Sequence, residues 1–483
     1  MRLTDLLKNV CAPPFEADVT GIACDSRKVE AGFAFVCIDG VEVDGHKFAQ
    51  SAIQNGATVL ITERDLGLPG QIIVPDTRAA WGVMSANWFG HPDERMRLIG
   101  VTGTNGKTST TYMLKQVLEA CGRKVGLIGT IQSMIGLRPI PACHTTPEAY
   151  ELQGLLAQMA DEGCDDVVME VSSHALAQHR VEAIAFDAGI FTNLTQDHLD
   201  FHLTMENYAD AKHQLFKKSR LSVLNADDPW EPVMAADLTG ETVTFSAAGA
   251  DADYAASDIR YAPDGVDFLV TGPDKAQSGR IRVPIPGEFT VYNALGTLAC
   301  LLSLGVPFDK AQAAFASLSG VKGRAEVVPT GRGFSVVIDY AHTPDGLEKI
   351  CSTLANSCEG HLITVFGAAG ERDRGKRPDM GRIAAKYSDL LVITSDNPRR
   401  EDPVSIINEV AAGVPDDTLY LICPNRFEAI RTAICRAEPG DIVLLAGKGH
   451  ETYQVLKNGI IHLDEREEVA KALGMKNKWE LGT

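Results

Sequence analysis

The sequence predicts a multidomain α/β protein with three domains. Its 483 residues exceed what a single hydrophobic core usually serves. Along most of the chain, apolar runs of strand length alternate with segments of helical periodicity, as in parallel sheets that helices cover on both faces. A glycine-rich loop, Gly100–Thr108, lies between one such strand and the next helix. These observations favour an α/β architecture built around a nucleotide-binding domain.

Residues 1–94 are predicted to form a small N-terminal α/β domain. Its apolar runs are Ala34–Ile38, Ala57–Thr62 and Gln71–Val74, and a helix is expected near Ala79–Phe89. The stretch Gly90–Glu94 then interrupts the pattern with Gly, Pro and a charge cluster. We therefore place a domain boundary near residue 94.

Residues 95–327 are predicted to form the central domain. Its expected strands are Leu98–Val101, Val125–Ile128, Asp166–Val171 and Ala188–Thr192, and helical segments lie between them. Residues 240–286 differ, because short alternating runs there are joined by Pro-Asp-Gly and Gly-Pro-Asp-Lys turns. We expect a small antiparallel sheet in this stretch, formed by Asp253–Ala262, Val266–Thr271 and Arg280–Pro286.

Residues 328–483 resume the strand–helix alternation and are predicted to form a Rossmann-like domain. The expected strands are Ser335–Asp339, His361–Phe366, Leu390–Thr394, Thr418–Cys423 and Asp441–Ala446, with helices such as Asn425–Ala437. No internal repeat or long linker separates the three domains. Short hinges near residues 94 and 327 are expected to let them pack together.

Composition narrows the class of partner. Lys and Arg total 45 against 64 Asp and Glu, and the net charge of −19 disfavours nucleic acid as the main partner. The chain contains no apolar run of membrane-spanning length. Its 11 cysteines show no zinc-like spacing, and Met1 begins no signal peptide, so we expect free thiols and a cytoplasmic location. Small molecules are the expected partners, and the protein is expected to be a monomer.

The stretch Gly103-Thr104-Asn105-Gly106-Lys107-Thr108 has the features of a phosphate-binding loop. Its glycines permit a tight turn, Lys107 supplies a cation for the terminal phosphates of ATP, and the Thr108 hydroxyl is a Mg²⁺ ligand. A helix is expected from Ser109 to Cys121, with its N-terminal dipole facing the phosphates. The strict Walker pattern requires a glycine at Val101, so the match is to a shorter variant. An ordinary glycine-rich turn is the alternative.

Polar side chains follow two further strands of the central domain. Glu170 ends an apolar strand, at the sheet edge where ligands of open α/β sheets bind, and it is placed to hold Mg²⁺. His198, in the run Asp197-His198-Leu199-Asp200, is a candidate ligand of a second metal. The alternative for His198 is a loop histidine with a backbone hydrogen bond. Spacing alone would make Lys212 a solvated surface lysine.

Later polar groups are ambiguous from spacing alone. Asn293, Arg324, Asp339 and His342 each have an alternative interpretation as a helix cap or turn residue. In the third domain, Gly370–Arg377 and Asp396–Arg400 are basic loops at strand ends on an otherwise acidic chain. Guanidinium groups bind carboxylates in bidentate fashion, so these loops favour an anionic substrate.

These motifs, in this order, resemble the Mur ligase family over nearly the whole chain. The resemblance rests on the phosphate-binding loop, Glu170–His174, Asp197–Asp200, Lys212, Asn293, Gly323-Arg324 and Asp339–His342. It implies amide formation driven by ATP through an acyl phosphate. Asp25-Ser26-Arg27, Thr145–Glu148, Gln178 and Arg180 point to members that extend UDP-N-acetylmuramoyl-L-alanyl-D-glutamate. In the family, Asp-Asn-Pro-Arg, here Asp396–Arg399, marks members that add meso-diaminopimelate.

The resemblance also implies roles for individual residues. Lys212 resembles the carbamylated lysine (N6-carboxylysine) of the family, which helps to hold a second Mg²⁺ with His198. The implied ATP contacts are Gly103, Thr104, Asn105, Gly106, Lys107, Thr108, Ser109, Asn293, Arg324, Asp339 and His342. The implied contacts of the UDP-substrate are Ser26, Thr145, Thr146, Ser172, Gln178 and Arg180. Those of diaminopimelate are Arg372, Asp396, Asn397, Pro398, Arg399, Gly447 and Glu451.

Two other functions compete with this one. A folylpolyglutamate synthase would share the phosphate-binding loop and a third α/β domain, but gives no reason for Asp25–Arg27 or Asp396–Arg399. A nucleotide-gated binding protein would need the loop alone, and the additional metal-binding candidates disfavour it.

Overall fold

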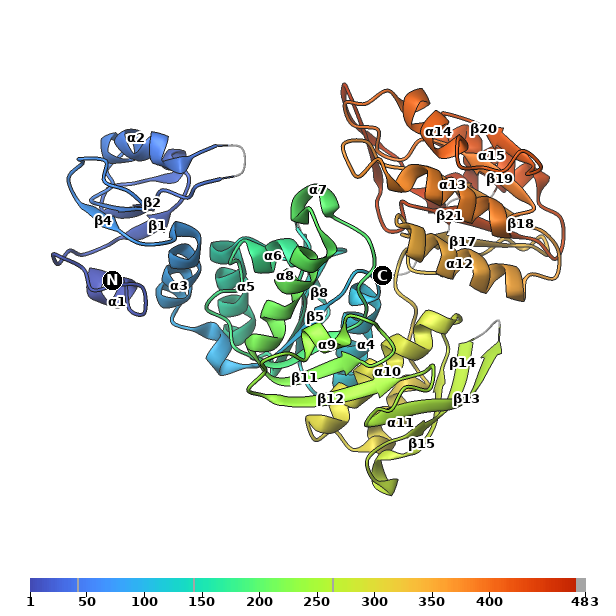
Figure 1. The fold of residues 1–483 in the computed structure, drawn as a ribbon, viewed down its shortest axis with the longest axis horizontal. Coiled ribbons are helices and arrows are strands. Elements are labelled where there is room, and N and C mark those ends of the chain that lie inside the picture. Colours follow the sequence, from blue (N-terminus) through green and yellow to red (C-terminus); the bar gives the residue numbers. More distant parts are fainter. Residues whose placement is uncertain (41–42, 142–143, 263–264, 475–483) are drawn as a thin grey trace.

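The computed structural model describes residues 1–40, 43–141, 144–262 and 265–474. Within these residues the strands form sheets of four, eleven, six and two strands. Figure 1 shows the N-terminal sheet and the C-terminal sheet at opposite ends of the molecule, with the eleven-stranded sheet between them. The α/β fold class predicted from the sequence is confirmed. None of the described helices is long and apolar enough to cross a membrane.

The N-terminal sheet is entirely parallel, in the order β1-β2-β3-β4. Its strands are β1 (Gly21–Ala23), β2 (Phe33–Val36), β3 (Val59–Thr62) and β4 (Gln71–Ile73), and the helices are α1 (Leu3–Leu6), α2 (Ala49–Gln54) and α3 (Thr77–Phe89). The sequence analysis did not predict β1, which has only three residues. Asp76 caps α3 by accepting from the backbone of Arg78 and Ala79, and Gly90 ends the helix with φ 73°.

The central sheet has the order β15-β14-β13-β12-β11-β10-β5-β9-β6-β7-β8. Its first eight strands in chain order are β5 (Arg97–Thr102), β6 (Val125–Ile128), β7 (Ser133–Ile135), β8 (Arg138–Ile140), β9 (Asp166–Glu170), β10 (Phe186–Phe191), β11 (Ser219–Asn225) and β12 (Glu241–Ser246). The helices are α4 (Lys107–Ala120), α5 (Ala149–Asp161), α6 (Ser173–Ala177), α7 (Leu199–His202), α8 (Met205–Lys217), α9 (Glu231–Met234), α10 (Glu288–Ser303) and α11 (Phe308–Phe315). Separate apolar clusters line the two faces of the sheet, as expected for helices on both sides.

The antiparallel pairing expected in residues 240–286 is confirmed for β13 (Tyr254–Ala262), β14 (Gly265–Thr271) and β15 (Gly279–Val283). These strands extend the central sheet, because β12 pairs in parallel with the start of β13. The nucleotide-binding sheet and the antiparallel strands are therefore one continuous structure.

The C-terminal sheet has the order β16-β17-β21-β18-β19-β20, and only β16 is antiparallel to its neighbour. Its strands are β16 (Glu326–Pro329), β17 (Ser335–Asp339), β18 (Leu362–Phe366), β19 (Leu390–Ile393), β20 (Tyr420–Ile422) and β21 (Ile442–Ala446), and the separate hairpin is β22 (Tyr453–Leu456) and β23 (Gly459–His462). The helices are α12 (Pro344–Ser357), α13 (Lys376–Tyr387), α14 (Pro403–Ala411), α15 (Arg426–Arg436) and α16 (Glu465–Ala472). Helices pack on both faces, through two apolar clusters. The Rossmann-like prediction is confirmed.

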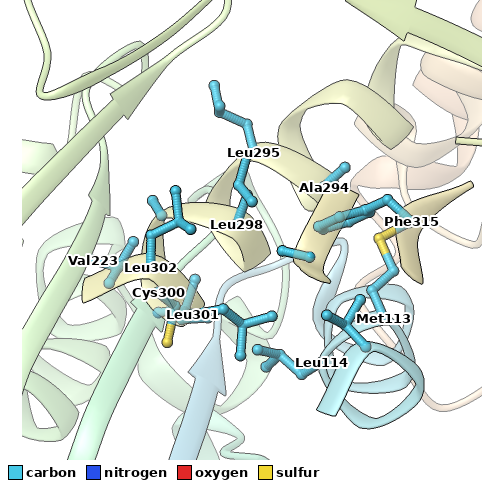
Figure 2. Packing of buried hydrophobic residues seen from close by; sticks show 14 of the residues in the cluster. Met113, Leu114, Val223, Ala294, Leu295, Leu298, Cys300, Leu301, Leu302 and Phe315 are labelled. Atoms are coloured by element: carbon cyan, nitrogen blue, oxygen red, sulfur yellow. The ribbon is translucent and has the colours of Figure 1, made fainter. Parts of the chain in front are cut away.

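Helix α10 anchors the phosphate-binding helix α4 in the central core. Figure 2 shows Leu301 of α10 beside Leu114 of α4, and Phe315 of α11 beside Met113 of α4; Leu298 of α10 belongs to the same cluster. All five side chains are buried. Since α10 also carries Asn293, this packing fixes Asn293 relative to the phosphate-binding loop.

Leu298→Ala should lower the free energy of unfolding by about 2–5 kcal/mol, because it removes buried methyl groups and leaves a cavity. Urea unfolding followed by circular dichroism would measure this loss. The control is Leu137→Ala, which truncates a side chain that is 85% exposed and should change stability by less than about 0.5 kcal/mol. Equal losses in the two variants would contradict the assignment of α10 to the core.

Candidate active site

The phosphate-binding loop connects β5 to α4, as predicted, although α4 begins at Lys107, two residues earlier than expected. Gly103 and Gly106 have φ values of 150° and 86°. A Cβ at Gly103 would lie 1.9 Å from Thr192 Oγ1, and one at Gly106 would lie 2.5 Å from Asn293 Oδ1. Both positions therefore require glycine for conformation and for space. Lys107 Nζ donates to the carbonyl oxygens of Gly103 and Thr104, at 2.8 and 2.9 Å.

Glu170 ends β9 and is fully buried. Both of its carboxylate oxygens lie 3.0 Å from Thr108 Oγ1, and Thr130 donates to it from its backbone N–H at 2.9 Å and its hydroxyl at 3.0 Å. These donors are neutral. A buried carboxylate with neutral donors needs a cation to compensate its charge, and two hard oxygen ligands side by side suit Mg²⁺.

Lys212 lies in α8 and is 1% exposed, so the surface interpretation from spacing is wrong. Its Nζ donates to the carbonyl oxygen of Gly103 at 2.9 Å and lies 4.5 Å from the centroid of the Tyr208 ring. Burial lowers the pKa of Lys212 well below its usual value, and the charge of Lys107 lowers it further. A lowered pKa makes the amine easier to deprotonate, and the uncharged amine is the nucleophilic form.

His198 begins α7 with φ 54° and lies among aromatic and charged groups. Its Nε2 is 3.4 Å from an oxygen of Asp197, and its ring lies edge-on to His174 at 4.8 Å. Burial lowers the pKa of His198, although Asp197 opposes that shift. A neutral imidazole is the form that binds metals.

Two residues from the segment before β16 and from α12 contact the phosphate-binding loop. Arg324 donates from Nη2 to Thr108 Oγ1 at 3.1 Å, and its guanidinium lies 4.6 Å from the centroid of the Tyr340 ring. Asp345, in α12, accepts from Asn105 Nδ2 at 2.7 Å. The loop is thus held by contacts from two units of the chain.

A tight backbone contact lies at the junction of these two units. Gly323 has φ 70°, and a Cβ there would lie 2.1 Å from the backbone nitrogen of His450 and 2.2 Å from the carbonyl carbon of Gly449. Position 323 therefore admits only glycine without movement of the loop that follows β21.

One cavity of about 240 Å³ collects most of the predicted ATP and metal residues. It is lined by Thr104, Asn105, Gly106, Lys107, Thr108, Ser109, Glu170, His198, Lys212, Asn293, Arg324, Asp339 and His342. Thr145 and Ser172, predicted for the UDP-substrate, also line it. Gly103 contributes through its carbonyl oxygen, which accepts from Lys107 and Lys212.

The remaining predicted UDP-substrate residues lie beside this cavity or apart from it. Arg180 donates to the backbone carbonyl oxygen of Thr146 at 2.9 Å and to Gln178 Oε1 at 2.8 Å, so these three residues form one group. Thr146 Oγ1 donates to the carbonyl oxygen of Glu170 at 2.8 Å. Ser26 lies in the N-terminal unit, directly after Asp25, and does not line the cavity.

The predicted diaminopimelate residues form a second cluster at strand ends of the C-terminal sheet. Arg399 has φ 53° and donates from Nη1 to the Gly370 carbonyl oxygen at 2.5 Å, while Asn397 Nδ2 donates to Glu451 Oε2 at 3.0 Å. Burial lowers the pKa of Arg399, and the charge of Arg372 lowers it further. Two neighbouring guanidinium groups create a positive site that suits a carboxylate. Asp396, Pro398 and Gly447 are buried in the same loops.

Among the described residues, no three His, Cys, Asp or Glu side chains are grouped to hold a metal. The metal-binding candidates are instead mixed: the carboxylate of Glu170 and the hydroxyl of Thr108, with His198 and Lys212 nearby. The buried carboxylate of Glu170, whose hydrogen-bond donors are neutral, fits a hard cation.

The sequence analysis did not select four residues that contribute to this site. Thr130 donates to Glu170, Tyr208 lies 3.2 Å from Thr104 Oγ1 through its hydroxyl, and Asp197 lies 3.4 Å from Lys376 Nζ of α13. The sequence does contain signals for these four residues. Thr130 follows a predicted strand, Tyr208 precedes Lys212 by one helical turn, and Asp197 and Lys376 lie inside motifs that were noted for other residues.

The chain belongs to the Mur ligase family. The family profile described as "Mur ligase family, catalytic domain" matches residues 18–87, "Mur ligase middle domain" matches residues 101–301, and "Mur ligase, glutamate ligase domain" matches residues 323–449. The resemblance stated from the sequence motifs is thereby confirmed.

Relatives of this chain match along its whole length. A UDP-N-acetylmuramoyl-L-alanyl-D-glutamate--2,6-diaminopimelate ligase from Caldanaerobacter subterraneus subsp. tengcongensis is 46% identical, over 99% of this chain and 100% of the relative. A solved structure of an enzyme with that name is 32% identical, covers 94% of this chain and 95% of its own, and has a TM-score of 0.69. Folylpolyglutamate synthase from Mycobacterium tuberculosis, complexed with ADP and AMPPCP, shares the fold with a TM-score of 0.65 at 19% identity, over 83% of this chain and 95% of its own.

Proposed function

We propose that this protein is an ATP-dependent carbon–nitrogen ligase that joins meso-diaminopimelate to UDP-N-acetylmuramoyl-L-alanyl-D-glutamate. The observation that carries the proposal is full-length similarity, at 46% identity, to a ligase of that name. The product would be the UDP-N-acetylmuramoyl-tripeptide, a precursor of peptidoglycan in cell-wall synthesis. The reaction would take place in the cytoplasm, on small-molecule substrates, with a monomer as the expected active form.

The reaction forms one amide bond at the expense of one phosphoanhydride bond. An oxygen of the D-glutamyl γ-carboxylate attacks the γ-phosphorus of ATP and releases ADP. The diaminopimelate amine then attacks the acyl carbon, loses a proton and displaces phosphate. Because two anions must approach each other in the first step, positive charge has to surround them. Lys107 and Arg324 supply it here: the Lys107 ammonium would exchange the carbonyl oxygens of Gly103 and Thr104 for phosphate oxygens.

Thr108 and Glu170 would hold one Mg²⁺, and His198 with a carbamylated Lys212 would hold a second. When bound, these ions offset the charge of the phosphates and the carboxylate. Carbamylation converts the Lys212 amine into an anion: its nitrogen attacks CO₂, a C–N bond forms, and the nitrogen releases a proton. The burial of Lys212 supports this assignment, since an uncharged amine is the reactive form.

The other substrates are assigned by the chemistry of the neighbouring groups. Asn293, Asp339 and His342 would contact the nucleotide, together with the residues of the phosphate-binding loop from Gly103 to Ser109. Ser26, Thr145, Thr146, Ser172, Gln178 and Arg180 would hold the UDP-substrate. Arg372, Asp396, Asn397, Pro398, Arg399, Gly447 and Glu451 would hold diaminopimelate.

The proposed activity is tested by phosphate release from ATP in the presence of Mg²⁺ and UDP-N-acetylmuramoyl-L-alanyl-D-glutamate. Release should depend on meso-diaminopimelate and should be far slower when lysine or glutamate replaces it. Mass spectrometry of the UDP product should show addition of one diaminopimelate. Equal rates with lysine would contradict the choice of amino acid, and dependence on a folate substrate would favour the synthase alternative.

Lys212→Ala should nearly abolish turnover, because the carbamate would be lost. Adding formate or acetate should restore part of the activity, since a small carboxylate can occupy the position of the carbamate. The matched control is Lys217→Ala, which removes an exposed lysine from the same helix and should leave turnover unchanged. Circular dichroism would verify folding, because Lys212 is buried. Near-normal activity in Lys212→Ala would contradict the metal-binding role.

Arg399→Ala should lower kcat/KM for diaminopimelate, because meso-diaminopimelate differs from lysine by one distal carboxylate that Arg399 would bind. Loss of one partner of a desolvated charge pair costs about 2–5 kcal/mol, which corresponds to a roughly 30-fold to several-thousand-fold decrease. Steady-state kinetics should show the effect mainly in the KM of diaminopimelate, with little change for ATP. Lysine should not become a comparable substrate.

The matched control is Arg400→Ala. The neighbouring Arg400 side chain is 87% exposed, and its Nε lies 3.8 Å from Glu371 Oε1. It should keep wild-type kinetics. Wild-type diaminopimelate kinetics in Arg399→Ala would show that the loop containing Arg399 does not bind the distal carboxylate.

A further inference from the structure

Lys448 is a buried lysine that none of the steps above uses. It follows β21, between Gly447 and Gly449, and its side chain is 0% exposed. The loop is tight, because a Cβ at Gly447 would lie 2.7 Å from Asp396 Oδ2. Burying an ammonium group is costly unless it is paired and hydrogen-bonded, so its partners indicate its role.

The Lys448 ammonium has partners on each side. Nζ lies 3.0 Å from Asn397 Oδ1, forms an ion pair with Glu451 Oε2, and lies 5.2 Å from the centroid of the Tyr453 ring. An ammonium has three N–H donors; two of them are used by Asn397 and Glu451, and the Tyr453 ring lies on a further side of the ammonium. Lys448 is therefore placed to act on its neighbours rather than on a ligand.

The first effect of Lys448 is on the orientation of the Asn397 amide. Oδ1 accepts from Lys448 and also from the backbone N–H of Val455, at 2.9 Å. Two donors at the oxygen fix which end of the amide faces them. The Nδ2 end must then face Glu451, to which it donates at 3.0 Å.

The second effect is on the two oxygens of Glu451. Oε2 accepts from both Lys448 and Asn397, whereas the hydroxyl of Tyr340 lies 3.5 Å from Oε1. The Glu451 side chain is 13% exposed. Lys448 thus holds one carboxylate oxygen inside the loop and leaves Oε1 as the oxygen with spare capacity for a ligand ammonium.

We infer that Lys448 is a positioning residue of the amino-acid site, which orients Asn397 and Glu451 for the ammonium end of the substrate. The inference rests on the proposed function, because it takes that substrate to be diaminopimelate. On this inference Lys448 contacts no substrate itself. It acts through Asn397 and Glu451, which would contact diaminopimelate. Such a residue should affect the binding of one substrate only.

The test compares Lys448→Met and Lys448→Gln in the full-length enzyme. Lys448→Met keeps the length of the side chain but removes all three donors, so the KM of diaminopimelate should rise about 10- to 100-fold, while kcat and the KM values of ATP and the UDP-substrate should stay within about threefold. Lys448→Gln restores an N–H donor and should give an intermediate KM. A merely structural role would not separate the substrates in this way.

The control is Lys386→Met, which removes an exposed lysine of α13 that pairs with Glu348 at 2.9 Å. It should keep wild-type kinetics. An unchanged diaminopimelate KM in Lys448→Met, or equal increases for all three substrates, would overturn the inference. If Lys448→Met does not fold, Lys448→Gln decides by the same criterion. Wild-type enzyme without diaminopimelate-dependent phosphate release would instead refute the proposed function itself.

Discussion

The site depends on a buried negative charge whose hydrogen-bond donors are neutral groups. Glu170 is fully buried at the end of β9, and its donors are the neutral groups of Thr108 and Thr130. Removing a carboxylate from water costs on the order of several kcal/mol unless a nearby positive charge compensates it. Glu170 ends β9, which pairs with β5 and β6 in the middle of the sheet. The consequence is that a bound cation would compensate the negative charge of Glu170.

The positive charges around this carboxylate come from different parts of the chain. Lys107 belongs to the phosphate-binding loop, whereas Arg324 belongs to the segment leading into the C-terminal sheet. The contacts of Arg324 with Thr108 and of Asp345 with Asn105 hold that sheet against the loop. The cavity therefore exists as a product of two packed units, and neither unit alone would contain its full set of side chains.

The sequence predicted those parts of the structure that local patterns determine. The phosphate-binding loop, the helix after it and most strands follow from glycine spacing and hydrophobic periodicity, because these depend on neighbours in the chain. Strands β1, β11 and β12 were among those missed, and length alone does not explain this, because β4 is as short as β1 and was predicted. The burial of Lys212 and the pairing of Asp197 with Lys376 were not predictable from spacing, since they depend on which helices pack against the loop. The domain boundaries near residues 94 and 327, and the substrate contacts of individual residues, stay predictions.

The contact of Gly323 with the backbone of Gly449 and His450 has a consequence for attempts to redesign this protein. Residue 323 directly precedes Arg324, which contacts Thr108 of the phosphate-binding loop, and residue 449 directly follows Lys448, which contacts Asn397. The two loops touch backbone to backbone, so a shift of one is transmitted to the other. Remodelling the loop after β21 would therefore also move the backbone beside Arg324. Variants selected for a different amino-acid substrate should have their use of ATP, as proposed above, measured in parallel.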